Sequence, residues 1–408
     1  MRDFKKVTVN KKAEASVRAG HPWVYGEEVT EKDEGIADGD IVDVYSEKSK
    51  YLGSGFYNSN SKILVRILSD NANDRFDEAF FRRRIKYAVD YRRTVMNGRL
   101  DCTRLIFGDS DMLPGLIADK FGPVVVTQTM TLGIEKRRDI IFPALIDILR
   151  EYGEEVNVLY ERNDVAVRAK EGLELGKGYY AYNGLFNEND GIPGCVEITE
   201  NGIKYSVDYI NGQKTGFFLD QKFNRAAAAS IAKDKNVLDC FTHTGAFALN
   251  CARNGAARVT AVDISEDAIK QTKLNAELNG ITNVDFLCCD VFELLTRLYN
   301  ENSKEYDYII LDPPAFTKSR STVKAAYKGY KEINLKAMRL LPRGGYLATC
   351  SCSHFMTDEL FRKMLADAAS DANVRIKIAE YRQQAADHPV LLGIPETEYL
   401  KFYIVQVV

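Results

Sequence analysis

The sequence contains no stretch of about 18–20 apolar residues, which is the length that a membrane-spanning helix requires. Its first residues include basic side chains, but no apolar segment follows them, so we expect no secretory signal. The formal net charge is only −3, with 55 Lys and Arg against 58 Asp and Glu, so the chain as a whole is not a polycation. We therefore expect a cytoplasmic globular protein without membrane contact.

Histidine is scarce, with four in 408 residues, and none of the eight cysteines forms the CxxC spacing that is typical of a structural zinc site. We therefore expect no metal centre. A disulfide framework is equally unexpected in a chain of this length in a reducing compartment. The cysteines are expected to be free thiols, most of them small core residues.

The length of 408 residues predicts two to four domains. Residues 1–75 form short strand-like segments separated by Gly, Asn, Asp and Ser turns, and we predict a small β-barrel there, with the only Trp, Trp23, in an aromatic-rich loop. Residues 76–190 mix helix and strand patterns and predict a central α+β domain. The strands and helices expected up to this point cover residues 5–9, 41–45, 52–57, 63–68, 76–100, 124–129, 135–152 and 157–160.

Basic residues concentrate on the helix expected over residues 76–100. Residues 1–100 carry 19 basic and 16 acidic side chains, and seven of the basic ones lie between Phe81 and Arg99. Four of them form one flank of that helix: Arg82, Arg83, Lys86 and Arg93. A solvated polar face is the usual meaning of such a run, and contact with RNA phosphates is the alternative if the rest of the chain handles nucleic acid.

After a Gly-, Tyr- and Asn-rich stretch at 176–191, strands and helices alternate regularly over residues 191–408. Strict alternation predicts a doubly wound parallel sheet, and two closing strands without an intervening helix predict an antiparallel edge. The expected strands cover residues 237–240, 259–262, 284–288, 308–311, 346–350, 374–380 and 400–407. The expected helices cover residues 245–253, 265–278 and 292–299, a long stretch that ends at Leu341, and residues 357–369.

Four of these strands end in an aspartate, namely Asp239, Asp263, Asp290 and Asp312. Ligands of open α/β sheets bind at the carboxyl ends of the strands, so we expect these side chains to line a ligand site. The first loop contains only Gly245 instead of the GxGxxG pattern, which disfavours a dinucleotide pyrophosphate. A carboxylate at 239 instead suits a cofactor with a positive charge and an amine.

Asp263 lies 18 positions after Gly245, which suits a ribose diol, and Asp290 can accept an adenine amino group. Together these positions predict S-adenosylmethionine as the cofactor. The alternative is that each aspartate is only a helix cap or a turn residue, and four at consecutive strand ends make this the less favoured interpretation.

Two motifs at later strand ends carry the candidate chemistry. Asp312 is followed by Pro313 and Pro314, which lock a turn and leave the carboxylate free to meet a flat group such as a nucleobase edge. Cys350 and Cys352 point the same way if their strand continues, and a cysteine there is nucleophilic when its pKa is lowered.

With these motifs in hand, the chain resembles the bacterial 23S ribosomal RNA cytosine-C5 methyltransferases, which carry an N-terminal PUA domain. The resemblance covers the whole length of the chain and rests on the following segments: His21-Pro-Trp-Val, residues 109–115, residues 211–221, residues 239–245, Asp312-Pro-Pro-Ala-Phe, Ser351-Cys-Ser, and residues 384–389. It implies a PUA domain at 1–75 and a class I methyltransferase domain at 191–408.

The resemblance also implies roles for single residues. Cys352 matches the nucleophile, and Cys350 then stands as a core substitution. Asp312 would hold the cytosine edge, and His388 is a candidate for the base that removes the C5 proton. The cofactor-binding residues implied are Lys214, Thr215, Phe218, Gln221, Asp239, Phe241, Gly245, Asp263, Ile264, Asp290, Asp312 and Pro313.

In the implied mechanism, a thiolate adds to cytosine C6, so that C5 becomes nucleophilic enough to attack the cofactor methyl group. The partner is ribosomal RNA, with the target base single-stranded or extruded from its helix. The sequence does not determine the oligomeric state, and a homodimer is one open alternative. Three rival functions stay open: methylation of a base nitrogen, nicotinamide-dependent oxidation, and RNA binding without catalysis.

Overall fold

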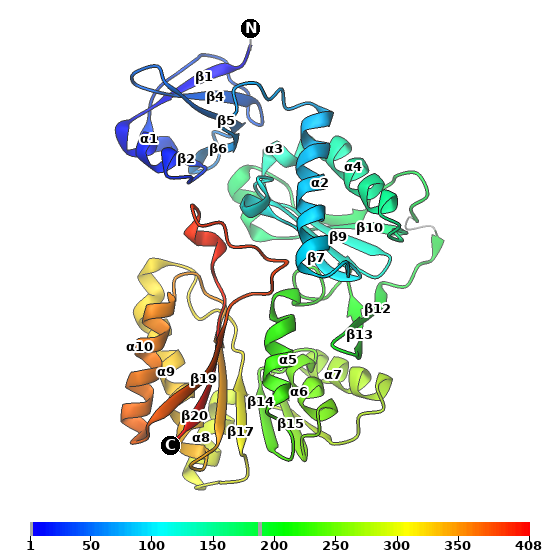
Figure 1. Ribbon diagram of the computed structural model, residues 1–408, viewed down its shortest axis with the longest axis vertical. Helices are drawn as coiled ribbons and strands as arrows, with labels where there is room; N and C mark the ends of the chain where they lie inside the picture. The colour runs from blue at the N-terminus through cyan, green and yellow to red at the C-terminus, as the bar shows by residue number, and fades with distance from the viewer. Residues whose placement is uncertain (1–2, 187–189) are drawn as a thin grey trace. The chain divides into compact units, whose positions relative to one another are not determined.

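The computed structural model describes residues 3–186 and 190–408 and divides into two compact units (Figure 1). The first unit comprises residues 1–198, 207–219 and 386–397. The second comprises residues 199–206, 220–385 and 398–408. A short two-stranded sheet of β12 (Cys195–Glu200) and β13 (Ile203–Asp208) supplies residues to both.

The first unit begins with a six-stranded sheet in the order β2-β6-β5-β4-β1-β3, so the predicted small barrel is an open half-barrel with edges at β2 and β3. Alternate side chains such as Val7, Val9, Val42 and Val44 are fully buried beneath it. Trp23 lies in a strand and not in the predicted loop. The elements are β1 (Lys5–Val9), α1 (Lys11–Arg18), β2 (Trp23–Tyr25), β3 (Val29–Lys32), β4 (Ile41–Ser46), β5 (Tyr51–Tyr57) and β6 (Ile63–Ser69).

The same unit contains a five-stranded sheet in the order β11-β10-β9-β8-β7, which is the predicted α+β region. The helix expected over 135–152 is two helices, because the backbone leaves helical geometry at Arg137, whose guanidinium donates to the carbonyls of Gly39 and Gly133. The elements are α2 (Glu78–Val95), β7 (Cys102–Phe107), β8 (Leu116–Phe121), β9 (Val124–Thr129), α3 (Leu132–Glu135), α4 (Arg138–Glu151), β10 (Val158–Asn163) and β11 (Gly176–Tyr179).

The second unit is built on a seven-stranded sheet in the order β16-β15-β14-β17-β18-β20-β19. The first five strands are parallel, and β20 is antiparallel to both β18 and β19, so the predicted doubly wound sheet with an antiparallel edge is confirmed. The strands are β14 (Asn236–Cys240), β15 (Arg258–Asp263), β16 (Val284–Cys288), β17 (Tyr308–Leu311), β18 (Tyr346–Ser351), β19 (Ile376–Arg382) and β20 (Lys401–Val407).

Helices cover both faces of this sheet (Figure 1). One face carries α8 (Val291–Asn300), α9 (Val323–Leu340) and α10 (Asp358–Ala372), whose apolar stripes close a large buried core against the central strands. The other carries α5 (Lys222–Ser230), α6 (Ala246–Arg253) and α7 (Glu266–Leu278). The loops that follow the parallel strands therefore gather at one edge of the sheet.

Within the described residues, every helix is too short or too polar to cross a bilayer.

Candidate active site

The register of the parallel strands brings the predicted aspartates to one edge of the second unit. Asp239 is paired with Ala261 of β15 and Ile310 of β17, one residue before β14 ends. Asp263 is the last residue of β15. Asp290 follows β16 and Asp312 follows β17, and the amide of Asp312 still donates to the carbonyl of Cys240.

Asp239 is fully buried, and one of its oxygens accepts two hydrogen bonds. Its Oδ2 accepts from Thr242 Oγ1 at 2.6 Å and from the amide of Ala248 at 2.9 Å. Its Oδ1 has no hydrogen-bond partner among the described residues. Burial raises the pKa of Asp239 to about 7. A buried carboxylate with one oxygen left over is what an ammonium-bearing ligand requires, so this site fits the predicted cofactor.

The loop after β14 has an unusual backbone. Phe241 and His243 have φ angles of 65° and 52°, and Gly245 has a φ of 80°. A Cβ at Gly245 would lie 2.5 Å from Cγ2 of Thr272, whose hydroxyl donates to the carbonyl of His243. The positive φ angles of Phe241 and His243 cost free energy, and such strain is typical of a loop that shapes a ligand site.

Two of the predicted aspartates also stabilise their own turns. Asp263 accepts from the amide of His243 through Oδ2 and from that of Ser265 through Oδ1, at 2.9 and 3.0 Å. Asp290 is the N-cap of α8 and accepts from the amide of Glu293 at 3.0 Å. Ile264 is 68% exposed beside them. Capping and ligand binding do not exclude each other, since a carboxylate has further lone pairs, so cofactor contact at these residues stays a prediction.

Asp312 lies in a cluster of polar groups. Gln221 Nε2 donates to its Oδ1 at 3.1 Å, and the thiol of Cys350 is also hydrogen-bonded to it. Burial raises the pKa of Asp312 to about 6, and the neighbouring Asp220 acts in the same direction. Pro313 is buried, so the turn holds this carboxyl at the strand end.

The two cysteines of the last motif have different environments. Strand β18 ends at Ser351, so Cys350 belongs to the strand and Cys352 does not, and the condition for their sharing a face is not met. Cys350 is fully buried, and burial raises its thiol pKa well above the ordinary value. Cys352 is partly exposed. Cys350 therefore stays a neutral thiol, which leaves Cys352 as the candidate nucleophile.

Hydrogen bonds fix the backbone on both sides of Cys352. Ser351 Oγ donates to the hydroxyl of Tyr330 at 3.1 Å, and Ser353 Oγ donates to the carbonyl of Thr317 at 2.8 Å. Lys401, the first residue of β20, donates from Nζ to the carbonyl of Ser353 at 2.6 Å. Lys401 was not identified from the sequence, in which the only signal was a lysine at the start of a largely apolar strand.

The other residues expected from the 211–221 motif lie in the first unit and are described with their own neighbours. Thr215 Oγ1 donates to Asp119 at 2.6 Å. The same carboxylate also accepts from Nε and Nη2 of Arg104, each at 2.7 Å. The ammonium of Lys214 lies 4.6 Å from the ring centroid of Phe218. Cofactor contact at Lys214, Thr215 and Phe218 stays a prediction.

The predicted basic flank lies on α2, and each of its four cations has a partner within the first unit. Arg82 is paired with Glu151 at 2.5 Å, Arg83 with Asp74 at 2.8 Å, and Lys86 with Asp90 at 2.9 Å. The guanidinium of Arg93 lies over the ring of Tyr152, 3.9 Å from its centroid. These pairs are exposed and therefore weak, so the flank remains available to phosphates but with much of its charge balanced.

His388, the candidate base, is buried in the first unit. Its Nδ1 lies 2.8 Å from Oδ1 of Asp387, and its ring packs against Phe107 at 5.3 Å between centroids. The carbonyl of Asp387 accepts from the buried guanidinium of Arg92. This arrangement holds the imidazole firmly, and its role as a base stays a prediction.

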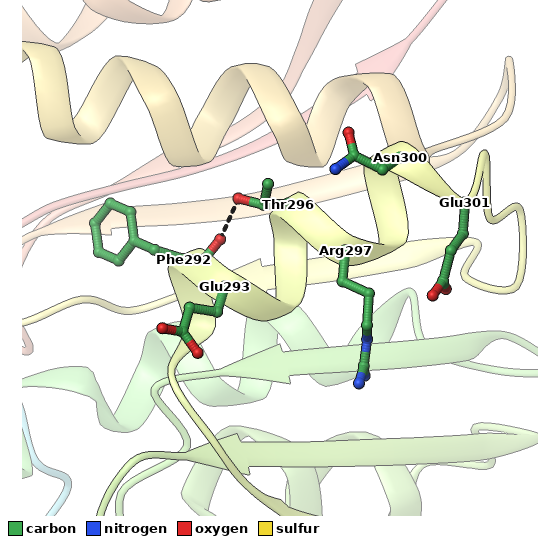
Figure 2. Close-up of a pocket in the computed structure, with 6 residues that line it drawn as sticks. All are labelled: Phe292, Glu293, Thr296, Arg297, Asn300 and Glu301. Carbon is green, nitrogen blue, oxygen red and sulfur yellow. Dashed lines mark hydrogen bonds between the residues drawn. The ribbon is translucent and has the colours of Figure 1, made fainter.

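A surface pocket is lined by other residues of the second unit. Figure 2 shows that its lining side chains come from α8 and the residue after it: Phe292, Glu293, Thr296, Arg297, Asn300 and Glu301. Within the helix, Thr296 donates from Oγ1 to the carbonyl of Phe292, one turn earlier, at 2.6 Å (Figure 2). None of the residues that the sequence singled out lines this pocket, so it is not the candidate active site. Over residues 3–186 and 190–408, no group of three or more His, Cys, Asp or Glu side chains is placed to hold a metal ion.

Two parts of the chain match models of known protein families. Residues 7–70 match the family model of a PUA-like domain, and residues 189–386 match that of an S-adenosylmethionine-dependent methyltransferase. A protein of Klebsiella pneumoniae named ribosomal RNA large subunit methyltransferase I is 39% identical over 407 residues, covering 99% of this chain and 98% of its own. A protein of the same name from Pseudoalteromonas atlantica is 41% identical over 405 residues, and the match covers 98% of this chain and 99% of that protein.

A solved structure shares the fold over nearly the whole chain. It comes from Streptococcus mutans and is described as a candidate SAM-dependent methyltransferase, with a TM-score of 0.81 and 23% identity over 98% of this chain and all of that one. At this identity the likeness concerns the fold alone.

Proposed function

Because the chain belongs to the ribosomal RNA large subunit methyltransferase I family, we propose that it transfers a methyl group to C5 of a cytosine in 23S ribosomal RNA. It is an S-adenosylmethionine-dependent methyltransferase, as the family of residues 189–386 indicates. The observation that carries the cytosine-C5 assignment is Cys352, a partly exposed thiol directly after the end of β18. Methylation of a base nitrogen has no need of a thiol there.

S-adenosylmethionine, when bound, supplies an electrophilic methyl group. Asp239 would hold its ammonium group through the buried oxygen that has no other partner among the described residues. Asp263 and Asp290 would hold the ribose and the adenine amino group, with Phe241, Gly245, Ile264, Gln221 and Pro313 as neighbours. Lys214, Thr215 and Phe218 are assigned to the same role on the resemblance of residues 211–221 alone.

Cys352 would act first, as a thiolate that forms a bond from Sγ to cytosine C6. Electron density then moves to C5, which would form a bond to the methyl carbon while the bond between that carbon and the cofactor sulfur breaks and its electron pair stays on the sulfur. A base removes the C5 proton, the electron pair of that C–H bond restores the C5–C6 double bond, and the thiolate leaves C6. Cys352 is thereby regenerated, and His388 remains the candidate for the base.

Asp312 would hold the N3/N4 edge of the cytosine during these steps. Its ionised form accepts a hydrogen bond from the N4 amino group. Because its pKa is raised to about 6, the carboxyl can also carry a proton for N3 when negative charge develops there in the adduct. Gln221 donates to the same carboxyl and keeps it oriented.

The target base must leave its helix to reach Cys352, because C6 is covered by stacking within a duplex. We assign the grip on the surrounding RNA to the PUA-like domain and to Arg82, Arg83, Lys86 and Arg93 of α2. The domain boundaries at 75 and 190, the cytoplasmic location and the homodimer stay predictions.

The proposal is tested by tritium release. Purified protein is given S-adenosylmethionine and unmodified large-subunit ribosomal RNA that carries tritium at cytosine C5, and tritium released to water is followed. We expect release by the wild type and by Cys350→Ala, and none by Cys352→Ala. Methyl transfer to the RNA without tritium release would contradict C5 chemistry and favour a base nitrogen as the acceptor.

A further inference from the structure

Lys401 is a buried lysine in the second unit. It is 2% exposed, and its Nζ donates to the carbonyls of Ser353 and Tyr399 at 2.6 and 2.8 Å. In the part of the chain that the structure describes, its ammonium forms no ion pair with a carboxylate. Two neutral carbonyls compensate only part of the cost of removing an ammonium from water, so a lysine at this position requires a further reason.

The register of the sheet places this lysine beside the candidate nucleophile. Lys401 is the residue of β20 that pairs with Ser351, the last residue of β18, and Cys352 is the next residue along the chain. Lys401 thus contacts the residues on both sides of Cys352, because its backbone pairs with Ser351 and its Nζ donates to the carbonyl of Ser353. Of the groups that favour the charged form of Lys401, Cys352 has the largest effect.

The other titratable groups near Lys401 do not provide it with a partner anion. Asp358 of α10 is engaged with Arg362 and Tyr403, and Glu398 accepts from Gln383. Tyr330 and Cys350, which both interact electrostatically with Cys352, are neutral near pH 7, because burial raises the pKa of Tyr330 to about 12 and that of the Cys350 thiol well above its usual range.

We propose that Lys401 is a positioning residue whose ammonium stabilises the thiolate of Cys352. The inference rests on the proposed function, since it assigns the activation of the same nucleophile. The Cys352 thiol loses its proton to solvent, the ammonium keeps its own proton, and elimination at the end of the reaction returns the same pair. The carbonyls of Ser353 and Tyr399 hold Nζ in place while the thiolate bonds to C6.

This arrangement is consistent with the electrostatics of Lys401 itself. Burial lowers its pKa to about 8, so it is still protonated at neutral pH, and a thiolate beside it favours that charged form further. The pair is therefore expected to be ionic near pH 7 and to be lost when the lysine deprotonates at higher pH.

The test measures the thiol without RNA or cofactor. The rate of alkylation of Cys352 by iodoacetamide is followed as a function of pH, with the modified peptide quantified by mass spectrometry so that the exposed Cys195 and Cys288 do not interfere. In the wild type we expect a midpoint at least one pH unit below the ordinary thiol value of about 8.5. A wild-type midpoint at or above that value would overturn the proposal without any variant.

Variants then assign the effect to the lysine. Lys401→Met, which keeps the volume and removes the charge, should raise the midpoint by about one unit or more and slow alkylation at pH 7 about tenfold. Lys401→Arg should restore much of the shift. Lys363→Met, at an exposed lysine of α10 paired with Asp367, is the matched control and should change nothing.

An unchanged midpoint in a folded Lys401→Met protein would overturn the proposal. The thiol measurement is independent of tritium release, so failure of the proposal for Lys401 can be distinguished from failure of the proposed reaction. A lowered midpoint that depends on Lys401, without tritium release, would support the lysine's role and contradict the proposed reaction. If the role of Lys401 and the proposed reaction are both correct, the acidic limb of the pH–rate profile for tritium release should move to higher pH in Lys401→Met.

Discussion

Asp239 is the single residue on which we expect the proposed cofactor site to depend most. Its pKa is raised from 3.8 to about 7 by burial, so the folded protein binds this proton more tightly than the unfolded chain does. The stability that this group contributes is therefore fully present below pH 4 and is lost as pH rises through 7. At pH 8 we therefore expect the ionised carboxylate to destabilise the fold, at a position where the proposed role is to bind the cofactor.

Asp239→Asn should therefore weaken cofactor binding and raise the stability of the fold. Relative to the wild type, we expect little change in the free energy of unfolding at pH 4, and a gain on the order of 2–4 kcal/mol at pH 8. S-adenosylmethionine affinity should fall at least tenfold. Urea unfolding at the two pH values and calorimetric titration check both effects. Asp267→Asn, at an exposed ion-paired residue of α7, should leave both quantities unchanged. Equal stability of Asp239→Asn and wild type at pH 8 would show that the ionised Asp239 does not lower the free energy of unfolding.

Asp312 predicts a different result, because its proposed partner is the nucleobase. Asp312→Asn keeps the shape and the hydrogen bond to Gln221 but cannot pass a proton to N3. We expect tritium release to fall about 10²–10³-fold, with S-adenosylmethionine affinity within a few-fold of the wild type. A proportional loss of cofactor affinity would instead make Asp312 part of the cofactor site alone.

At the residue scale, the sequence predicted the strand-end aspartates and Cys352 because strand ends can be located from hydrophobic periodicity. It did not find the Cys350–Asp312 contact or Lys401. Both depend on which side chains meet across β17, β18 and β20, and that register is not a local property of any segment.

At the scale of elements, the loop between β14 and α6 combines backbone strain with close packing. Gly245→Ala should destabilise the protein by about 1–3 kcal/mol, because the φ of 80° disfavours a side chain and the new methyl group meets Cγ2 of Thr272 at 2.5 Å. Adding Thr272→Ser removes that methyl group while keeping the hydroxyl bond to His243. The double variant should therefore recover the steric part of the loss but not the part due to φ. Additive losses in thermal unfolding would contradict this account.

The α2 helix predicts that removing acidic side chains tightens RNA binding. Asp74, Asp90 and Glu151 balance Arg83, Lys86 and Arg82, so converting these acids to Asn or Gln frees cations for phosphates. We expect the triple variant to bind large-subunit RNA more tightly, with a steeper dependence of affinity on salt. The triple variant of the three cations to Ala should do the opposite. Unchanged affinity and salt slope in both would exclude α2 from the RNA interface.

The elements that sequence patterns missed are short or interrupted. Regular alternation made the seven-stranded sheet predictable, including its antiparallel edge. Helix α1 has only eight residues, and β7 and β8 are joined through the turn at 108–115, so neither gave a clear periodic signal. Trp23 was predicted to lie in an aromatic-rich loop, yet strand β2 begins at this residue, directly after Pro22.

At the scale of the whole molecule, the division into two units could not be read from chain order. Residues 207–219 and 386–397 belong to the first unit although the residues on either side of them belong to the second. Composition and turn signals detect boundaries along the chain, whereas these segments are assigned by contacts between distant residues, such as Thr215 with Asp119 and Arg92 with Asp387.

The cofactor should stabilise the whole protein by mass action, since a ligand that binds only the folded state adds its binding free energy to folding. With S-adenosylmethionine at about 100 times its Kd, the expected gain is about 2.7 kcal/mol, or a rise in Tm of about 5–10 °C for the unit that holds the site. Scanning calorimetry at several ligand concentrations checks the size and its logarithmic dependence. Asp263→Asn should reduce the shift at every concentration, because the affected affinity enters the same relation. A catalytically silent RNA-binding protein that had lost its pocket would show no shift at all.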